Sequence, residues 1–545
     1  MNFDATRNLF IEGDNLDALK LLQETYLAKV KLIYIDPPYN TGSDFIYDDD
    51  FVADAESYLI RSNQINPSGD RLVATSEANG RFHSDWLDMM LPRLKLARNL
   101  LSDEGAIFIS IDDGELAALK LICDEVFGAN NYCGLVSRST GTRMGDGDRA
   151  FASELDYILV YSKSPNTVFA GLPMTEDEKA IYDQIDGRGR YLLRSLRRTG
   201  GENRREDRPS MFFPLIAPDG TEVLPIAPAG YESRWVCSRA TYQKLIEDGF
   251  IEWKKVEKEG TERWQVYQKH YLGSGKKQPS NLWTDEEGNK KATKDLNALF
   301  GGNKVFDHPK PIGLIQRIVS LVTDPQGEDI VLDFFAGSAS TGHAVWAQNN
   351  LDNGNRKFVL VQLPEALSLE NSAQQVAAKL CDELNVPRTV AEVSKERLRR
   401  AAELLKSLGL DNGFRILKID TSNFKDVYYA PDSISQDDLG LQTENIKEDR
   451  ASEDLLFQVL VDWGVDLTLP IEKQTISGHT VYYVDGNALV ACFDFGVGED
   501  LVKELAKQKP LRAVFRDSSF AGDSVKINVE QIFKLLSPDT EVKSL

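Results

Sequence analysis

Strand-like and helix-like segments alternate in two separate parts of this sequence, and this alternation restricts the fold that the chain can adopt. Residues 1–163 alternate short apolar runs with amphipathic stretches, and residues 306–430 resume the same pattern. Such alternation is typical of a parallel sheet with helices on both faces. We therefore predict an α/β fold whose core comes from two halves of the chain.

The remaining two parts of the chain depart from this pattern. Residues 164–305 are richer in Gly, Pro, Arg and Trp and contain hairpin signals such as APDGTEV, which predicts a module inserted between the halves of the core. Residues 431–545 predict a small separate α/β domain, with strands at TVYYVDG and ALVACFDF. A chain of 545 residues is long enough to form several cores.

Charge is distributed unevenly along the chain. The formal net charge of −22 would by itself argue against a nucleic-acid partner. However, residues 431–545 contain 21 Asp and Glu against 11 Lys and Arg, whereas residues 188–208 contain eight Arg against three acids. A local basic patch is therefore compatible with an acidic protein.

Other compositional features indicate a cytoplasmic protein without metal. The five cysteines are dispersed and include no CxxC pair, which indicates reduced thiols and no zinc site. No apolar run approaches the length of a membrane span, and the N-terminus MNFDATRNLF has no signal-peptide pattern, so no membrane association is expected.

The segment KLIYIDPPY ends a predicted buried strand with a carboxylate, two prolines and an aromatic ring. The exocyclic amine of a nucleobase is a weak nucleophile because its lone pair is delocalised into the ring. The Asp36 carboxylate and the Pro37 carbonyl could accept its two N–H bonds and favour tetrahedral nitrogen as a methyl group arrives. Pro37 and Pro38 fix φ and add no competing donor, and Tyr39 offers a face to an unstacked, flipped-out base. The alternative is a simple strand terminator.

The segment DFFAGSASTG, residues 333–342, follows the predicted strand DIVLDFF in the same way. Ligands of open parallel sheets bind at the carboxyl ends of the strands. Gly337 permits close approach of a ligand, and the helix that follows offers free N–H groups to an anion. The GxGxxG pattern is absent. The guest could be a dinucleotide or the carboxylate of S-adenosylmethionine, and a plain strand-to-helix turn is a third interpretation.

Together, these two segments resemble the motifs of amino-group DNA methyltransferases, in the order of their permuted β class. Nearly the whole chain resembles the modification subunit of type III restriction–modification systems, through IEGDNLDALKLL, IDPPYNTGSDFIYDDDF, FHSDWLDMMLPRL, HPKPIGLIQRI, DFFAGSASTGHAV, KFVLVQLPE, RREDRP and LLFQVLVDWGVDLTLP. This resemblance implies a Rossmann-like, seven-stranded, circularly permuted methyltransferase core. Its catalytic half would be residues 1–163 and its cofactor-binding half residues 306–430, with a target-recognition insert at 164–305 and a C-terminal domain at 431–545.

The resemblance also implies an activity and partners. We expect a site-specific adenine-N6 methyltransferase that uses S-adenosyl-L-methionine and acts on a short asymmetric sequence of double-stranded DNA. A homodimer and a separate restriction subunit with helicase and nuclease activity are implied as well. The alternatives are N4-cytosine methylation, whose enzymes more often have serine in place of Asp36, RNA methylation, and a catalytically inactive DNA-binding subunit.

The resemblance assigns the site residues by position. The predicted catalytic residues are Asp36, Pro37, Pro38 and Tyr39. The predicted cofactor-binding residues are Asp14, Lys310, Pro311, Asp333, Phe335, Gly337, Ser338, Gln362 and Glu365. Many relatives have an acid at position 362 to accept the ribose hydroxyls, so either Gln362 or Glu365 is expected to serve here. Ala339 stands where many methyltransferases have glycine.

The arginine-rich segment of the insert is the predicted DNA reader, because arginine suits guanine edges and phosphates and asparagine suits adenine. The predicted DNA-binding residues are Arg188, Arg194, Arg197, Arg198, Asn203, Arg204, Arg205 and Arg208. A solvated arginine face, or ion pairs with Glu202, Glu206 and Asp207, is the alternative. The tryptophans are predicted to form the small core of the insert and are Trp235, Trp253, Trp264 and Trp283.

Overall fold

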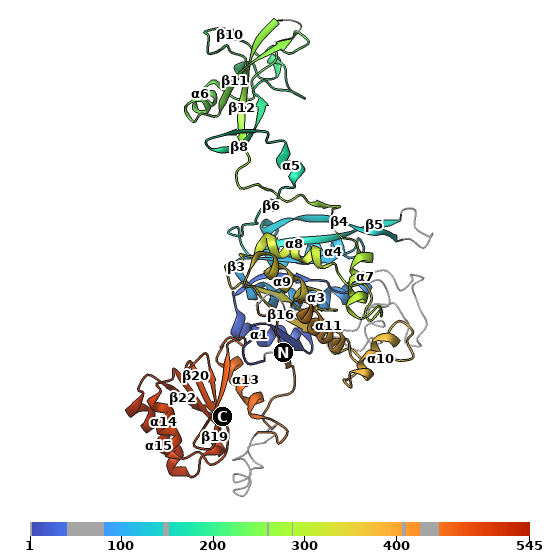
Figure 1. Ribbon diagram of the computed structural model, residues 1–545. Coiled ribbons are helices and arrows are strands. Elements are labelled where there is room, and N and C mark those ends of the chain that lie inside the picture. Colours follow the sequence, from blue (N-terminus) through green and yellow to red (C-terminus); the bar gives the residue numbers. More distant parts are fainter. Residues whose placement is uncertain are drawn as a thin grey trace. The chain divides into compact units, whose positions relative to one another are not determined.

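The structure is a computed structural model that describes residues 3–40, 81–144, 152–258, 261–285, 287–405, 410–425 and 446–545 (Figure 1). The chain forms two compact units, one of Met1–Ala170 with Ser280–Leu545 and one of Gly171–Pro279. The second unit is shorter than the predicted insert of 164–305. The reason is that β14 (Leu282–Trp283) pairs with a strand of the first unit, so that residues after Pro279 pack with the core.

A nine-stranded sheet lies at the centre of the first unit, in the order β14-β4-β5-β3-β2-β15-β16-β1-β17. Besides β14, its strands are β1 (Leu9–Glu12), β2 (Val30–Ile35), β3 (Leu101–Ile111), β4 (Tyr132–Met144), β5 (Ser153–Ser162), β15 (Ile330–Asp333), β16 (Lys357–Gln362) and β17 (Arg415–Lys418). The sheet therefore has nine strands where seven were predicted. The seven from β4 to β1 are extended by β14 at one edge and by β17 at the other.

A parallel sheet had been predicted, but the observed sheet is mixed. From β3 to β17 all neighbours are parallel, but β5 runs antiparallel to both β3 and β4. The physical reason is the short connection between β4 and β5, which lacks the dozen or more residues that a parallel crossover requires.

Strands β2 and β15 are adjacent at the centre of the sheet although they come from different halves of the chain. Both are mostly apolar, with Lys31 in β2 and Asp333 at the end of β15 as the exceptions, as expected for strands that are covered on both faces. From β15 the chain continues to β16 on one side, and from β2 it continues to β3 on the other side. The carboxyl ends of β2 and β15 are therefore the switch point of the sheet, where ligands of such folds bind.

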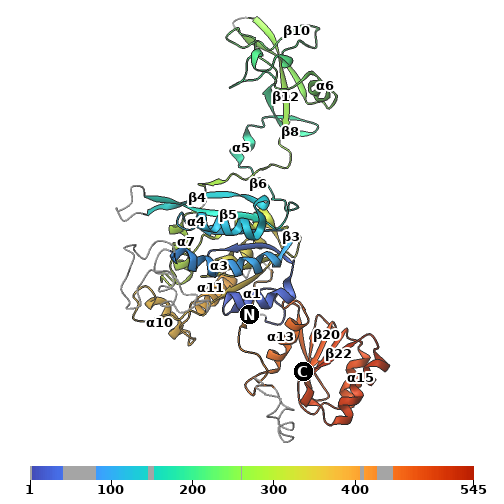
Figure 2. The same cartoon turned by 180° about the vertical axis from the view of Figure 1, so that it is seen from behind.

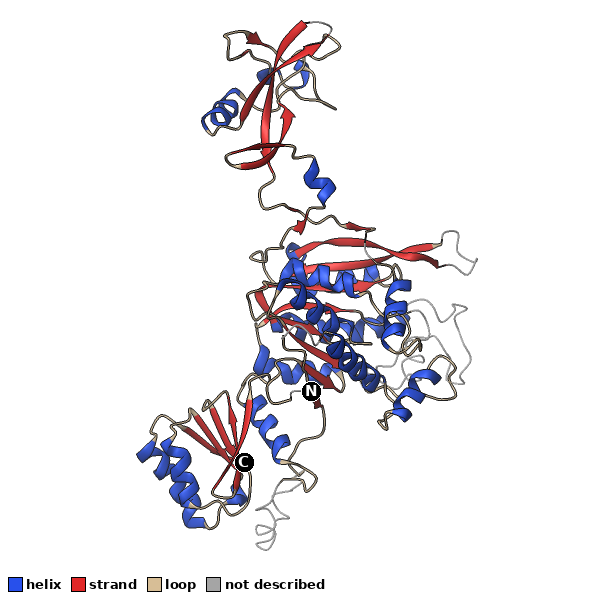
Figure 3. Cartoon of the chain, viewed as in Figure 1, coloured by secondary structure: helices blue, strands red, loops and turns tan. Residues whose placement is uncertain are grey.

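Helices cover both faces of the sheet (Figure 3). The first face carries α1 (Asn15–Tyr26), α3 (Arg81–Leu100) and α4 (Leu116–Cys123). Figure 2, which is turned by 180° from Figure 1, shows these three helices. Their apolar side chains form one cluster with Ile33 and Ile35 of β2. The second face carries α8 (Ile312–Val322) and α9 (Ser340–Asp352), with α11 (Val390–Leu404) packed against α9. A Cβ on Gly342 of α9 would lie 2.9 Å from Leu398 of α11 and 3.0 Å from Leu360 of β16, so these elements meet closely.

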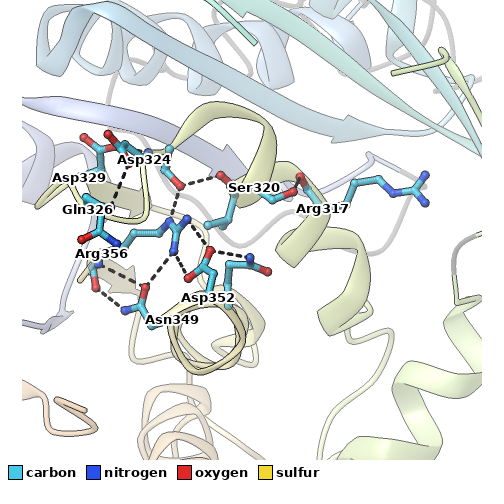
Figure 4. A network of polar contacts seen from close by, with 11 residues as sticks. Arg317, Ser320, Asp324, Gln326, Asp329, Asn349, Asp352 and Arg356 are labelled. Carbon is cyan, nitrogen blue, oxygen red and sulfur yellow. Dashed lines mark hydrogen bonds and ion pairs between the residues drawn. The ribbon is translucent and has the colours of Figure 1, made fainter. Parts of the chain in front are cut away.

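A buried arginine fixes α8 and α9 at their C-terminal ends (Figure 4). Arg356, which is 3% exposed, donates to both carboxylate oxygens of Asp352 at 2.9 Å and to Asn349 at 3.2 Å. Its Nε also donates to the hydroxyl of Thr323, directly after α8, at 2.5 Å. The two helices are thus joined at the end opposite to their first residues.

The C-terminal part of the chain has a five-stranded sheet of its own and belongs to the first unit. Its elements are α13 (Ser452–Asp462), β18 (Ile471–Ile476), β19 (His479–Val484), β20 (Leu489–Cys492), α14 (Glu499–Lys507), β21 (Arg512–Phe515), α15 (Asp523–Leu536) and β22 (Glu541–Ser544). The Asp466 carboxylate accepts from the hydroxyl of Tyr26 at 2.8 Å and from Lys357 at 3.1 Å. These bonds attach the C-terminal part to α1 and β16.

The second unit is built on a four-stranded sheet in the order β11-β12-β8-β7. Its principal elements are β7 (Gln184–Asp186), β8 (Gly189–Ser195), α6 (Arg239–Glu247), β11 (Ile251–Lys258) and β12 (Thr261–Tyr271). Trp235 lies in its apolar cluster and Trp253 packs against it, with Trp264 edge-on to Trp253. Trp283 was predicted in this core, and that prediction was wrong, because β14 places Trp283 in the first unit.

Candidate functional site

The two predicted motifs begin directly at the carboxyl ends of adjacent strands. Asp36 follows β2, and Phe334 follows β15. Because these strands are hydrogen-bonded neighbours, the segment 36–39 and the turn 334–339 lie side by side at the edge of the sheet. The structure therefore brings together the predicted catalytic motif and the predicted cofactor loop.

Side chains from later parts of the sequence hold the corner formed by Asp36–Tyr39. The indole N–H of Trp86, a fully buried residue of α3, donates to the carbonyl of Pro38 at 2.7 Å. Asn40, which has a positive φ of 58°, donates to Glu115 at 2.6 Å. By contrast, no residue that the structure describes donates to the carbonyl of Pro37. One prolyl oxygen is thus bonded, and the other has no donor within the described chain.

Lys310 joins the two halves of the site. Its ammonium lies 2.7 Å from Oδ1 of Asp36 and 2.8 Å from Oδ2, and 4.7 Å from the centre of the Tyr39 ring. Lys310 had been predicted at the methionine end of a cofactor, and the structure places it on the predicted catalytic carboxylate. Pro311, beside it, is the N-cap residue of α8. Burial and the nearby charge of Asp36 raise the pKa of Tyr39 well above its usual range, so its hydroxyl stays protonated.

The glycine turn is held by hydrogen bonds of its own residues and by one to the end of β16. Gly337 has a φ of 50° and donates its N–H to Oε1 of Gln362 at 2.6 Å. The buried carboxylate of Asp333 accepts from the N–H of Phe335 at 3.0 Å and from the hydroxyl of Thr341 at 2.5 Å. Burial raises the pKa of Asp333 to about 7, opposed by these two bonds and supported by the charge of Asp36. Asp333 therefore shapes the turn from inside.

Two predicted cofactor residues have structural bonds of their own. Asp14 is the N-cap of α1 and accepts from the N–H groups of Leu16 and Asp17 at 2.8 and 3.1 Å. Its neighbour Asn15 donates to the carbonyl of Phe334 at 2.8 Å, which attaches α1 to the turn. Gln362 uses its amide oxygen for Gly337.

Glu365, the other predicted ribose acceptor, is half-buried. Within the described parts of the chain, its carboxylate has no hydrogen-bond partner, and burial raises its pKa. Of the two predicted ribose acceptors, Gln362 and Glu365, it is therefore Glu365 whose side-chain oxygens have no donor within the described chain.

No functional role was predicted for α11, yet two of its residues contact the glycine turn. Arg397 donates to the carbonyl and the hydroxyl of Ser338 and to the hydroxyl of Ser340, and Ser394 contacts the carbonyl of Gly337. Both residues are buried. The signal that could have revealed them is a serine and an arginine three positions apart, on the buried side of the amphipathic helix that contains SKERLRR.

The predicted DNA-binding residues lie in the second unit, in the turn before β8 (Arg188), on β8 (Arg194) and in the loop that follows it. Several are engaged: Arg188 donates to the carbonyl of Asp248 at 2.7 Å, Arg205 pairs with Glu232 at 2.7 Å, and Asn203 donates to Tyr231 at 3.1 Å. Arg204 lies 4.8 Å from the Tyr231 ring, and Arg197 donates to the carbonyl of Arg198 at 3.4 Å. Among the described residues, the exposed side chains with neither a polar partner nor an aromatic contact belong to Arg194, Arg198 and Arg208.

The backbone of this arginine loop is fixed by two buried residues of the same unit. Ser233 donates to the carbonyl of Asn203 at 2.6 Å, and Arg234 donates to the carbonyl of Glu202 at 2.6 Å. The alternative of ion pairs with Glu202, Glu206 and Asp207 is not seen, because the one ion pair that this loop makes within the described chain uses Glu232.

The described chain has neither a metal-binding cluster nor a helix that could span a membrane. None of its groups of His, Cys, Asp and Glu has a metal-binding arrangement. None of its helices is long and apolar enough to cross a membrane.

Comparison with known proteins identifies similar chains. Residues 30–360 match the family of N6 and N4 methyltransferases that is described as DNA methylase. The type III restriction-modification enzyme StyLTI Mod subunit of Salmonella typhimurium is 35% identical over 74% of this chain. That alignment spans only 58% of the StyLTI subunit.

Two other relatives are aligned over more of their own length. The type III EcoPI Mod subunit of Escherichia phage P1 is 30% identical over 90% of this chain and 77% of its own. The type II methyltransferase M.KpnI of Klebsiella pneumoniae is 34% identical over 71% of this chain and 87% of its own. The similar proteins therefore include both modification subunits of type III enzymes and a type II methyltransferase.

Proposed function

This chain belongs to the DNA methylase family, and from that premise we propose that it methylates the exocyclic N6 of adenine in a short asymmetric sequence of double-stranded DNA. The observation that carries the proposal is the pair of acceptors at the end of β2. The Asp36 carboxylate and the unbonded carbonyl of Pro37 lie next to the glycine turn at the end of β15. An amine with two N–H bonds is the group that this pair fits.

The role of the corner follows from its bonds. Asp36 and Pro37 accept the two N–H bonds of the amine, which draws its lone pair out of the ring and toward the methyl group. Trp86 fixes the neighbouring Pro38 carbonyl, so the corner keeps its shape without a substrate. The Tyr39 ring supports the flipped-out base. Once the nitrogen is methylated, its excess proton passes to solvent.

The cofactor is proposed to be S-adenosyl-L-methionine, which supplies a methyl group on a sulfonium. The turn fits it: Gly337 permits close approach, Phe335 and Ser338 belong to the same turn, and the turn leads into the start of α9, where free N–H groups favour a carboxylate. Glu365 has free acceptor oxygens for ribose hydroxyls, whereas the oxygen of Gln362 is already used by Gly337. We therefore assign the ribose to Glu365.

Lys310 has to yield part of its contact before the amine can bind. Its ammonium now occupies both oxygens of Asp36, and the face of Tyr39 lies on its other side. A cation held by a carboxylate and an aromatic face shows that this corner favours positive charge. The same preference would stabilise the positive charge that develops on the amine during transfer.

The second unit is proposed to read the DNA sequence. Its exposed Arg194, Arg198 and Arg208 are available to phosphates or base edges, while Ser233 and Arg234 hold the loop that bears two of them. By analogy with its type III relatives, we propose that the chain is a homodimeric, cytoplasmic modification subunit that works with a separate restriction subunit.

The proposal is tested by incubating the purified chain with double-stranded DNA and S-adenosyl-L-methionine that carries a labelled methyl group. Sequencing that detects modified bases then gives the base, the atom and the site. N6-methyladenine at one asymmetric site is expected. Asp36→Asn, which keeps the shape but removes one strong acceptor, should abolish transfer and still bind DNA. Methylation of cytosine N4, or transfer only to RNA, would overturn the adenine assignment.

A further inference from the structure

We infer that Arg397 and Ser394 of α11 are positioning residues that hold the glycine turn in the shape that binds the cofactor. The inference rests on the proposed cofactor site and adds two residues that lie outside every motif considered above. Neither residue reaches the reacting atoms, since both contact the turn on the side that faces α11. They act on the reaction through Gly337, Ser338 and Ser340.

The contacts of Arg397 are concentrated on two positions of the turn, Ser338 and Ser340. Its Nη1 donates to the carbonyl of Ser338 at 2.9 Å, to the hydroxyl of Ser338 at 2.6 Å and to the hydroxyl of Ser340 at 2.6 Å. The hydroxyl of Ser394 contacts the carbonyl of Gly337 and also donates to Val390 at 2.9 Å within the helix. The carbonyl groups of Gly337 and Ser338 are thus both turned toward α11, and their position sets the direction of the N–H groups that follow.

The backbone of the turn needs such external support. Gly337 has a φ of 50° and Ala339 a φ of 60°, and a non-glycine residue with positive φ is strained. Strained conformations of this kind persist only where surrounding contacts determine them. Arg397 and Ser394 supply such contacts from below, and Gln362 supplies one from the end of β16.

The charge of Arg397 is the second argument. The residue is 3% exposed, and no carboxylate pairs with it in the described chain. A buried cation without a counter-ion is costly, and burial lowers the pKa of Arg397 to about 9, so it remains a cation at neutral pH. His343, one turn into α9, adds no charge because burial and Arg397 lower its pKa to about 3. A positive charge without a counter-ion, placed beside the N-terminus of α9, favours the binding of an anionic group at that N-terminus.

A second buried arginine in the same half of the core provides a matched control. Arg356 is also 3% exposed, but it is fully bonded to Asp352, Asn349 and Thr323 at the far end of α9 (Figure 4). Loss of either arginine should destabilise this half of the protein. Only loss of Arg397 should also change the turn.

The experiment compares full-length Arg397→Met, Arg397→Lys, Ser394→Ala and Arg356→Met with the unchanged chain. Cofactor affinity is measured by calorimetry at a temperature at which circular dichroism shows every variant folded. We expect Arg397→Met to weaken binding of S-adenosyl-L-methionine by about tenfold or more, because hydrogen bonds of a charged group are lost. Arg397→Lys should recover part of this loss, and Ser394→Ala should cost about threefold.

A structural role and a positioning role give different results. In a positioning role, KM for the cofactor rises while kcat at saturating cofactor changes by less than about threefold, and Arg356→Met lowers the melting temperature but leaves affinity within about twofold. Equal weakening by Arg356→Met, or unchanged affinity in Arg397→Met, would overturn the inference. If Arg397→Met does not fold, Arg397→Lys and Ser394→Ala decide the question by the same comparison.

The proposed function and this inference can fail separately. Absence of cofactor binding by the unchanged chain would refute the proposed function. The positioning role is then read from hydrogen exchange of the amides of residues 335–341 without any ligand. Faster exchange there in Arg397→Met but not in Arg356→Met supports it, and equal exchange in the two variants refutes it.

Discussion

The ammonium of Lys310 lies against both carboxylate oxygens of Asp36, at 2.7 and 2.8 Å. This contact joins the start of α8 to the end of β2, and therefore the two halves of the core that are separated in the sequence. It also means that the proposed catalytic carboxylate has a partner before any substrate arrives. The contact is partly buried, with side-chain exposures of 10% for Lys310 and 26% for Asp36.

Replacement of Lys310 by methionine tests what this contact does. We expect kcat/KM for methyl transfer to fall by about tenfold or more, because Asp36 loses the group that orients it. The cost in unfolding free energy should be about 1 kcal/mol, since the pair is only partly buried. Steady-state kinetics and thermal melting measure the two effects.

A closely similar ion pair elsewhere in the first unit serves as the control. Lys357 and Asp466 are 3.1 Å apart with exposures of 11% and 24%. Lys357→Met should lower stability to a comparable degree and leave kcat/KM unchanged. An equal loss of activity in both variants would show that the effect of Lys310 is one of stability alone.

The carboxyl group of Asp333 predicts a pH dependence of stability. Its pKa in the folded protein is raised to about 7, above the ordinary value of 3.8, so the folded state holds a proton that the unfolded state has released. The contribution of Asp333 to the free energy of unfolding is therefore fully present below pH 3.8 and is lost as the pH rises from there to about 7. The slope of this loss is up to about 1.4 kcal/mol per pH unit.

Thermal melting between pH 5 and pH 8 measures this contribution. Asp333→Asn keeps the shape of the side chain and cannot titrate, so the difference in melting temperature between the two proteins should change steadily with rising pH. A difference that is constant across this range would contradict the raised pKa.

Ala339 tests how far the turn is strained. Its φ of 60° is unfavourable by about 1–2 kcal/mol for a residue other than glycine. In Ala339→Gly, relief of this strain is offset by the greater freedom of glycine in the unfolded chain and by loss of one buried methyl group. We expect a net change in unfolding free energy of less than about 1 kcal/mol.

The bulkier Ala339→Val should be destabilised by more than about 2 kcal/mol, because a β-branched side chain is strongly disfavoured at positive φ. Denaturant unfolding of both variants provides the measurement. Similar stability of the glycine and valine variants would mean that position 339 is not strained.

The boundaries of the second unit predict how recognition can be exchanged. Replacing Gly171–Pro279 with the matching segment of a relative should change the sequence that is methylated and leave the core folded. Replacing residues 164–305 should instead destabilise the core, because it removes β14 and Asn289, to which the buried Arg138 donates at 2.8 Å. Modified-base sequencing and thermal melting check the two outcomes. An unchanged methylated sequence after the first exchange would place recognition elsewhere.

The proximity of the two motifs could be predicted from the sequence, because parallel strands end at the same edge of a sheet. The partners of individual side chains could not. Lys310 meets Asp36, Gln362 meets Gly337, and Arg397 meets Ser338 through contacts between elements far apart in the chain. Periodicity indicates which face of an element is buried, but not which polar group it meets there.

The strand count shows the same limit on a larger scale. The apolar pattern indicated the central strands such as β2, which are buried whatever their neighbours. The edge strand β14 has only two residues, Leu282 and Trp283, and its place depends on the presence of β4 beside it. A short segment of this kind has no periodicity from which its partner could be predicted.

The bonds of Arg356 fix the ends of α8 and α9 that lie away from the proposed site. Thr323, directly after α8, and Asp352, the last residue of α9, are bonded to the same guanidinium, so these helices cannot slide past each other at that end. Their opposite ends, about 16 Å away along α8, carry Lys310 and the glycine turn. The two ends of this helix pair therefore divide their roles: one anchors the packing of the half-core, and the other is left free to carry the chemistry.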